Sequence, residues 1–242
     1  MCQVCEETSV LSSRRRSFLK FAGLGLAVSA MPAFAAENAP PKPQNVISPD
    51  AALERLMKGN ARYVDNAPLP SDFASTRAAL TTGQNPFASV LSCSDARITP
   101  EHCFDAERGD LFVARIAGNY LTTGLLASLE YGAAVLQSPL IMVLGHTNCG
   151  AISAAISAEV NNTDYPGHIS IITSDLAPAV RAAMKKNPSN LALAVVRENV
   201  SMNVQALRDS TPILRKRVQD GQLKIVGGIY NLDTGKVEVM TA

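Results

Sequence analysis

Tryptophan is absent from this sequence, and the other aromatic residues are few. The 242 residues include no Trp, and aromatic side chains make up 5% of the chain. Proteins that bind single-stranded nucleic acid stack the bases on aromatic side chains. The formal net charge is only +1, from 22 basic and 21 acidic residues, so the chain also lacks the basic excess that binds phosphate backbones. We therefore expect no nucleic-acid partner.

Charged residues are also scarce, whereas apolar residues are abundant. Asp, Glu, Lys and Arg together make up 18% of the chain, and 47% of the residues are apolar. This apolar content excludes an intrinsically disordered chain, and the length is sufficient to bury a sizeable core. The composition indicates an Ala-rich soluble globular protein, either an enzyme or a small-ligand binder.

The N-terminal segment has the pattern of a signal peptide. A basic run, Arg14–Lys20, precedes an uncharged apolar run at 21–31, and Ala33–Ala35 follows with small residues at its first and third positions. The apolar run is too short to span a bilayer as a helix, and the small-x-small pattern is typical of a signal-peptidase site. We predict a signal peptide at 1–35, and no membrane span in the mature form.

The basic run further resembles a twin-arginine signal, the type that exports folded proteins. Arg15 and Arg16 are followed by Ser17 and then Phe18–Lys20, as in that signal, although Arg14 stands where Ser or Thr is usual. The resemblance implies a periplasmic or otherwise exported protein.

Few cysteines remain beyond the predicted cleavage point. Of five in the chain, only Cys93, Cys103 and Cys149 follow residue 35. An odd, small number in an exported protein argues against a disulfide framework. We interpret Cys103 as a core thiol on a short helix after Pro100, which leaves two thiols to explain.

Strand and helix patterns alternate along the predicted mature chain. After a proline-rich leader at 36–47, Ser48 is placed to cap a first helix. A polar stretch at 64–86 is expected to be a loose connection that could contain a short helix around 75–81. Strands are predicted at 89–92, 111–115, 140–144, 223–230 and 236–240, and helices at 122–137, 150–159, 168–186, 190–208 and 212–219. This alternation predicts an α/β fold, with a mainly parallel sheet and flanking helices.

Residues with metal-binding chemistry follow two of the predicted strands. The first group is Cys93–Arg97, after the strand at 89–92, and the second is His146–Gly150, after the strand at 140–144. Ligand sites in α/β sheets form at the carboxyl ends of strands, where both groups could meet. Two thiolates and an imidazole are suitable zinc ligands, and a site with only three such ligands is typical of a catalytic metal.

Other interpretations remain open from the residues alone. Cys93 and Cys149 could be small buried hydrophobes, or one of them a nucleophile with His146 as its base. Asp95 and Arg97 could form a surface ion pair. A non-catalytic zinc-binding or storage module is a further alternative, although such a site needs neither Asp95 nor Arg97.

Six motifs carry a family resemblance. They are GQNP at 83–86, CSDAR at 93–97, GDLFVAR at 109–115, AGN at 117–119, SLEY at 128–131 and GHTNCG at 145–150. Their identity and order resemble the β-class carbonic anhydrases over about 48–240. The resemblance implies a β-carbonic anhydrase catalytic domain at 48–242, with a parallel sheet extended by an antiparallel edge strand. It also implies reversible hydration of carbon dioxide to bicarbonate and a proton.

The resemblance assigns the metal-site residues one by one. Cys93, His146 and Cys149 would bind one Zn²⁺ per subunit. Asp95 would be either a fourth ligand in a resting state or, when paired with Arg97, an acceptor for a hydrogen bond from zinc-bound water. Arg97 would keep the Asp95 carboxylate ionised.

The resemblance also implies a substrate pocket and an oligomer. Gln84 and the backbone N–H of Gly150 would orient carbon dioxide or bicarbonate. Phe112, Ala117 and Tyr131 match positions that line the apolar part of the pocket, partly from a neighbouring subunit. The assembly would be a homodimer or a multiple of dimers.

Two further expectations concern regulation and substrate choice. Some relatives hold an inhibitory bicarbonate near a Trp three residues before the first zinc cysteine, but that position is Val90 here. We therefore expect no such allosteric pocket and an open site near neutral pH. Carbon disulfide or carbonyl sulfide hydrolysis in the same fold remains an alternative activity.

Overall fold

The structure is a computed structural model that describes residues 46–70 and 72–240. The predicted signal peptide at 1–35 and most of the predicted leader at 36–47 lie outside these residues. In the part of the chain that is described, none of the helices combines the length and apolar character that crossing a membrane requires.

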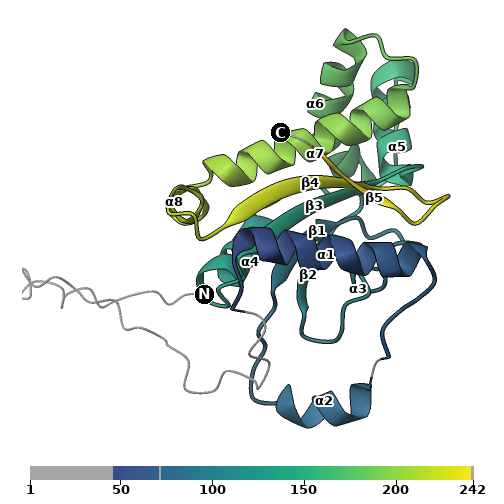
Figure 1. The fold of residues 1–242 in the computed structure, drawn as a ribbon. Coiled ribbons are helices and arrows are strands. Elements are labelled where there is room, and N and C mark those ends of the chain that lie inside the picture. The colour runs from purple at the N-terminus through teal and green to yellow at the C-terminus, as the bar shows by residue number, and fades with distance from the viewer. Residues whose placement is uncertain (1–45, 71, 241–242) are drawn as a thin grey trace, which may run out of the picture. The chain divides into compact units, whose positions relative to one another are not determined.

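A five-stranded sheet forms the centre of the fold (Figure 1). Its strands are β1 (Ala88–Ser92), β2 (Leu111–Arg115), β3 (Leu140–His146), β4 (Lys224–Tyr230) and β5 (Val237–Met240). The spatial order is β2-β1-β3-β4-β5; the first four strands are parallel, and β5 is antiparallel to β4. All seven residues of β3 are buried, as expected for an apolar strand covered on both faces. The predicted fold class is confirmed.

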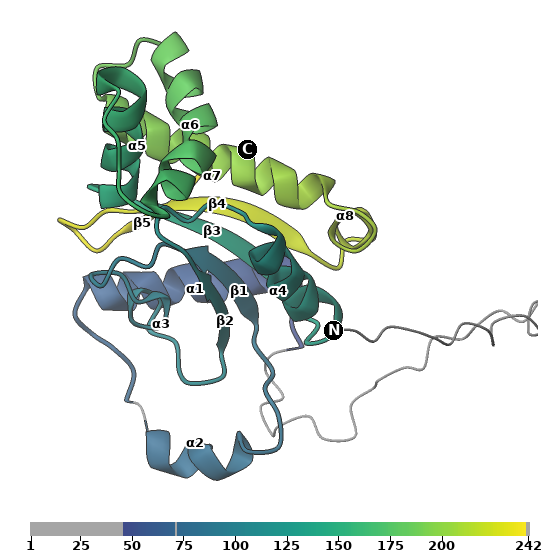
Figure 2. The ribbon, with the colours of Figure 1, turned by 180° about the vertical axis from the view of Figure 1, so that it is seen from behind.

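One face of the sheet is covered by helices from the middle and the C-terminal part of the chain (Figure 2). These are α4 (Thr123–Ala134), α5 (Gly150–Asn161), α6 (Ile169–Lys185), α7 (Leu191–Asp209) and α8 (Leu214–Gln219). Helix α7 packs closely on β3 and β4 because glycines face it. A Cβ on Gly145 would lie 2.7 Å from Cγ2 of Val200, and one on Gly227 would lie 2.6 Å from Cγ1 of Val200.

The opposite face is covered mainly by α1 (Pro49–Val64) and the short α3 (Pro100–Cys103). Helix α1 begins as predicted, because Ser48 Oγ accepts a hydrogen bond of 3.2 Å from the Ala51 N–H. Leu56 of α1 is fully buried in the same apolar cluster as Val90 and Met142 of the sheet. The predicted loose connection at 64–86 contains a seven-residue helix, α2 (Phe73–Ala79).

Candidate metal centre

Two neighbouring strands bring the chemistry-bearing residues together. Strands β1 and β3 are adjacent and parallel, so both end at the same edge of the sheet. Cys93 directly follows β1, His146 is the last residue of β3, and Cys149 caps the N-terminus of α5. The ligand atoms of these three residues lie within 4.8 Å of one another, and all three side chains are buried. We call this set the Cys-His-Cys cluster.

The spacing of the two sulfurs fits a tetrahedral ion. Cys93 Sγ and Cys149 Sγ are 4.0 Å apart. Two Zn–S bonds of about 2.3 Å at a tetrahedral angle place the sulfurs about 3.8 Å apart. None of the three cysteines in the described residues forms a disulfide. The thiols therefore lie at the separation that a shared zinc ion requires.

The His146 ring is oriented with one nitrogen free. Nδ1 lies 2.9 Å from the carbonyl oxygen of Thr147, and a carbonyl can only accept a hydrogen bond. Nδ1 therefore carries a proton, and in the neutral ring Nε2 keeps its lone pair. Nε2 is buried and has no hydrogen-bond partner among the described residues. A buried nitrogen left in this state is costly, and a metal ion in the cluster would satisfy it.

The surrounding backbone favours negative charge on the sulfurs. The Gly118 N–H donates a 3.2 Å hydrogen bond to Cys93 Sγ, and the N–H groups of Ala151 and Ile152 in the first turn of α5 support charge on Cys149. Contact between the thiols lowers the pKa of Cys93 to about 4, because Cys149 donates to its thiolate. The same contact raises the pKa of Cys149. Without metal the pair therefore keeps one proton, which metal binding would release.

Asp95 lies at the edge of the cluster and is held by Arg97. Arg97 donates three hydrogen bonds to this carboxylate: from Nε to Oδ1 at 2.9 Å, from Nη2 to Oδ2 at 2.7 Å, and from its backbone N–H to Oδ1 at 2.9 Å. These bonds from Arg97 lower the pKa of Asp95 to about 2. Oδ2 of Asp95 is 3.9 Å from Nε2 of His146, so the pair adjoins the cluster rather than lying on a remote surface.

Arg115, the last residue of the motif at 109–115, supports the cluster in a way that the sequence did not predict. Arg115 Nε donates a 2.9 Å hydrogen bond to the carbonyl of Cys93, and Nη2 donates hydrogen bonds of 2.8 Å to the carbonyls of both Asp95 and Ile98. One guanidinium thus fixes the backbone of the loop that carries Cys93 and Asp95. No signal in the residue types alone could have shown these contacts, because their acceptors are main-chain atoms.

Two of the five predicted pocket residues lie beside the cluster. Ala117 is half-buried and precedes Gly118, whose N–H reaches Cys93. Gly150 is the first residue of α5, next to Cys149, and a Cβ on it would meet nothing within 4 Å. Gly150 therefore leaves open space beside Cys149.

The other three predicted pocket residues lie toward the opposite end of the strands. Gln84 is exposed and precedes β1, whereas Cys93 follows it; five residues of strand span about 17 Å. Phe112 pairs in register with Ser89 near the start of β1, and its ring lies 6.3 Å from that of Tyr131 on α4. Within one chain, the structure does not bring Gln84, Phe112 or Tyr131 to the cluster.

The remaining cysteine and histidines do not join the cluster. Cys103 is buried in the apolar cluster beneath α1, and burial raises the pKa of its thiol, as expected for a core residue. His102 lies in α3 and His168 caps α6. Neither belongs to the group of possible metal ligands found in the described residues.

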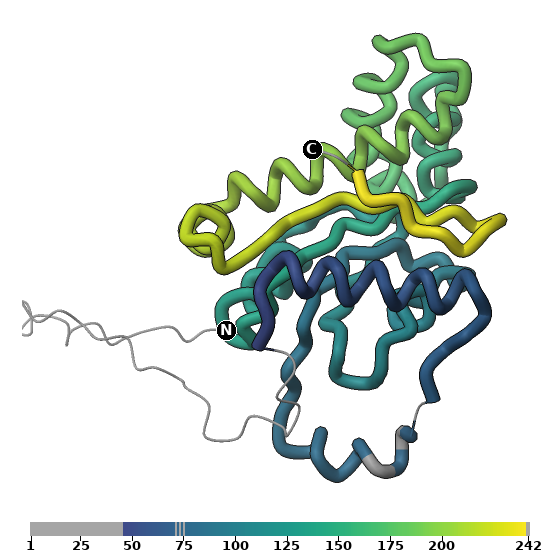
Figure 3. Tube along the Cα trace, viewed as in Figure 1, coloured from purple at the N-terminus to yellow at the C-terminus, as the bar shows by residue number. Residues whose placement is uncertain are grey.

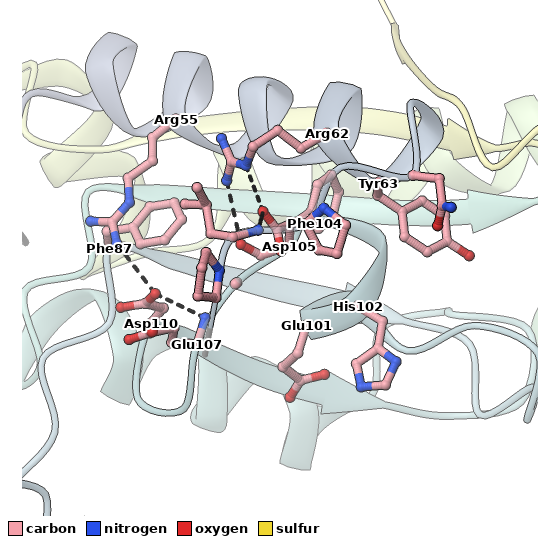
Figure 4. Close-up of a pocket in the computed structure, with 15 residues that line it drawn as sticks. Arg55, Arg62, Tyr63, Phe87, Glu101, His102, Phe104, Asp105, Glu107 and Asp110 are labelled. Carbon is pink, nitrogen blue, oxygen red and sulfur yellow. Dashed lines mark hydrogen bonds and ion pairs between the residues drawn. The ribbon is translucent and has the colours of Figure 1, made fainter. Parts of the chain in front are cut away.

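A separate cavity of about 590 Å³ lies between α1 and the segment 101–110 (Figure 4). Arg55 there stacks 4.0 Å from the ring centroid of Phe87 and lies 3.3 Å from Asp110, while Arg62 pairs with Asp105. The cavity's arginines are therefore already neutralised by carboxylates. The residues of the Cys-His-Cys cluster are not among those that line it.

Comparison with known proteins agrees with this geometry. The protein-family model described as carbonic anhydrase matches residues 88–237. Carbonic anhydrase 2 of Mycobacterium tuberculosis is 36% identical over 190 residues, which cover 78% of this chain and 91% of the relative. A carbonic anhydrase of Mycolicibacterium smegmatis is 36% identical over 193 residues, which cover 79% of this chain and 93% of the relative.

A solved structure extends the agreement to the fold. The β-carbonic anhydrase of Coccomyxa, solved in complex with acetazolamide, has a TM-score of 0.58 and is 27% identical, covering 78% of this chain and 86% of that one. The matched family region contains both strands that end at the cluster. The chain thus belongs to the β-class carbonic anhydrase family and is an enzyme of that family.

Proposed function

We propose that the Cys-His-Cys cluster holds one catalytic Zn²⁺ and that the enzyme reversibly hydrates carbon dioxide to bicarbonate and a proton. The observation that carries this proposal is the buried, unpartnered Nε2 of His146 beside two thiols spaced for a tetrahedral ion. Zinc, when bound, supplies the chemistry by lowering the pKa of water toward neutrality.

The residues around the cluster have separate roles in this proposal. Asp95, with its pKa held near 2 by Arg97, is ionised at working pH and can only accept a hydrogen bond. It would therefore orient a water molecule by accepting a hydrogen bond from it. Arg97 is not available to substrate as a free charge, because it is bound to Asp95 and to the carbonyl of Asn148, 3.2 Å away.

Stopped-flow hydration assays on the zinc-loaded chain test the activity across pH 6.5–9. The chain is expected to accelerate hydration. Asp95→Asn is expected to keep its zinc while losing about tenfold or more in kcat, because a hydrogen bond to a charged acceptor contributes about 1.5–3 kcal/mol. A binding or storage module would show zinc uptake without turnover. Parallel assays with carbon disulfide and carbonyl sulfide would show whether the chain hydrolyses these alternative substrates.

A second subunit is part of the proposal. Gln84, Phe112 and Tyr131 lie toward the end of β1 and β2 that is distant from the cluster of the same chain. They can line a pocket at a metal site only if it belongs to a neighbouring copy. In a symmetric dimer each copy would place these residues at the cluster of the other copy, so that two composite sites would form.

Mixed dimers test this arrangement. Gln84→Ala and Cys93→Ser chains are each expected to be inactive alone. Co-expressed with different tags, they should recover about a quarter of the wild-type activity, because half of the dimers then contain one intact site. If each site is built from a single chain, the mixture remains inactive.

Export is the third part of the proposal, and it is supported by the residues at 1–35. A periplasmic enzyme would interconvert carbon dioxide and bicarbonate outside the inner membrane. Cell fractionation should find a shortened chain in the periplasm, and a variant with Arg15→Lys and Arg16→Lys should accumulate unprocessed in the cytosol. Full-length wild-type protein in the cytosol would refute export.

A further inference from the structure

Among the described residues, the Nδ1 atom of the His146 ring is hydrogen-bonded to the Thr147 carbonyl. The position of this oxygen decides which ring nitrogen carries the proton. With the oxygen at Nδ1, the lone pair lies on Nε2, the nitrogen that faces Asp95 and the thiols. If the carbonyl turned away, the ring could place its proton on Nε2 and would then lose its ligand atom.

Thr147 follows the end of β3, and two hydrogen bonds hold it in place. Its N–H donates a 3.0 Å hydrogen bond to the carbonyl of Tyr230, at the end of β4. Its Oγ1 accepts a 3.0 Å hydrogen bond from the N–H of Leu232, just beyond β4. The peptide that orients His146 is therefore anchored to the turn between β4 and β5.

This turn is itself closely hydrogen-bonded. Asn231 Oδ1 accepts from the N–H groups of Asp233 and Thr234, at 2.8 and 3.3 Å. The Asn231 N–H donates 2.9 Å to Lys236 O, and its carbonyl accepts 2.8 Å from the Gly235 N–H. The turn can therefore serve as a fixed support for Thr147.

Helix α1 holds the turn from the other side. Asn60, only 2% exposed, donates through Nδ2 to the carbonyls of Gly235 and Cys103, both at 2.9 Å, and accepts 2.8 Å from the Val237 N–H. The turn, yellow in Figure 3, and α1, in purple and blue, are joined by these bonds. A continuous set of hydrogen bonds thus connects α1 to the metal-binding imidazole.

We propose that Thr147 is a positioning residue for His146: its hydroxyl ties the carbonyl that selects the ring tautomer to the β4–β5 turn. The proposal rests on the metal site proposed above. Removing the hydroxyl leaves the Leu232 N–H without its acceptor and releases one of the two bonds that hold residue 147. Metal affinity then falls although every ligand is still present.

The test compares Thr147→Val with Thr147→Ser. Valine has nearly the shape of threonine but cannot accept a hydrogen bond, whereas serine can. Thr147→Val is expected to weaken zinc binding about tenfold, the lower end of what loss of an outer-shell partner costs, as measured by competition with a chromophoric chelator. Thr147→Ser is expected to stay within about twofold of wild type.

A second readout needs neither metal nor activity. Long-range ¹H–¹⁵N NMR on the metal-free chain reports which nitrogen of His146 is protonated. The Nδ1–H form is expected to dominate in wild type and Thr147→Ser, and to be mixed with the Nε2–H form in Thr147→Val. This measurement stands even if the wild-type chain takes up no zinc, a result that would refute the proposed function alone.

Thr122→Val is the matched control. Thr122 Oγ1 likewise accepts a backbone N–H, that of Leu125, at the start of α4. This variant loses a comparable bond outside the network that orients His146, so its zinc affinity should match wild type. Equal weakening in both valine variants, or wild-type affinity and tautomer in Thr147→Val, would overturn the proposal.

Asn231→Ala keeps the proposal testable if Thr147→Val does not fold. This variant removes the side-chain acceptor that closes the turn and leaves Thr147 intact. It is expected to weaken zinc binding in the same direction, by about threefold. A folded Asn231→Ala chain with unchanged affinity would count against the turn as the support of His146.

Discussion

At the scale of single residues, the charge on Asp95 depends on one neighbour. Arg97 contacts both carboxylate oxygens, and the pKa of Asp95 in the folded chain is about 2, against about 3.9 in an unfolded chain. A carboxyl group with a depressed pKa stabilises the fold above its unfolded pKa. That contribution disappears as the pH falls from about 4 through about 2.

Carboxyl ¹³C NMR on wild type and Arg97→Ala checks this pH dependence. The Asp95 signal should titrate near pH 2 in wild type and move toward the ordinary range in Arg97→Ala, because the main donor is gone. The stability that the charged pair contributes should accordingly be lost at a higher pH in the variant. Identical titration in both chains would contradict the assigned cause.

Residue types indicated the candidate metal ligands but not the groups that support them. The side chains of Cys93, His146 and Cys149 suit zinc, and their positions after two strands predicted that they could meet. The residues alone also allowed core thiols or a nucleophile, and only the family resemblance assigned the three to zinc. Thr147 and Arg115 act on the site through main-chain carbonyls. Such contacts depend on where the backbone turns in space, and no residue pattern encodes that locally.

At the scale of elements, α1 approaches the C-terminal end of α3 closely because Gly59 has no side chain. A Cβ on Gly59 would lie 1.8 Å from the carbonyl oxygen of Phe104, a backbone atom that cannot move aside cheaply. The same substitution at Gly124, in α4, would meet nothing within 4 Å. The two glycines therefore respond oppositely to a methyl group.

Urea unfolding should separate these cases. Gly59→Ala is expected to lower the free energy of unfolding by about 3 kcal/mol, because α1 must shift away from α3. Gly124→Ala is expected to raise it by about 0.5 kcal/mol through helix propensity. If Gly59→Ala changed the free energy of unfolding no more than Gly124→Ala does, α1 would be able to shift away from α3 without cost.

Periodicity predicted the presence of the main elements well, and their ends less well. Strand β3 was expected to end at 144 but continues through Gly145 to His146. Glycine and histidine carry no strand signal; the pairing of Gly145 with Ile229 and of His146 with Tyr230 extends the strand. Tertiary pairing thus placed His146 on the sheet itself rather than in a loop.

At the scale of the whole molecule, the sheet order explains which sites one chain can build. Alternating strands and helices predicted the parallel sheet, because right-handed crossovers leave few arrangements. Strand direction then sets Cys93 and Gln84 beyond opposite ends of β1. Assembly with a second copy cannot be derived from one chain's pattern, because it depends on surfaces rather than on the core.

Metal removal should affect the stability of the whole fold. A ligand present at 100 times its Kd stabilises the native state by about 2.7 kcal/mol, which in a domain of this size raises Tm by about 5–10 °C. Scanning calorimetry with zinc and with EDTA should show this difference. Cys93→Ser is the control and should show a much smaller shift; equal Tm values in wild type would mean that no ion is held.

Cys93 and Cys149 are 56 positions apart in the chain, and they meet only because β1 and β3 pair as neighbours. A nascent or extended polypeptide offers His146 and Cys149 close together, but the third donor is remote. Tight capture of a zinc ion at the Cys-His-Cys cluster would therefore have to wait until these two strands have docked. A zinc-loaded chain would therefore be one in which β1 and β3 have already paired, and an incompletely folded chain would remain metal-free.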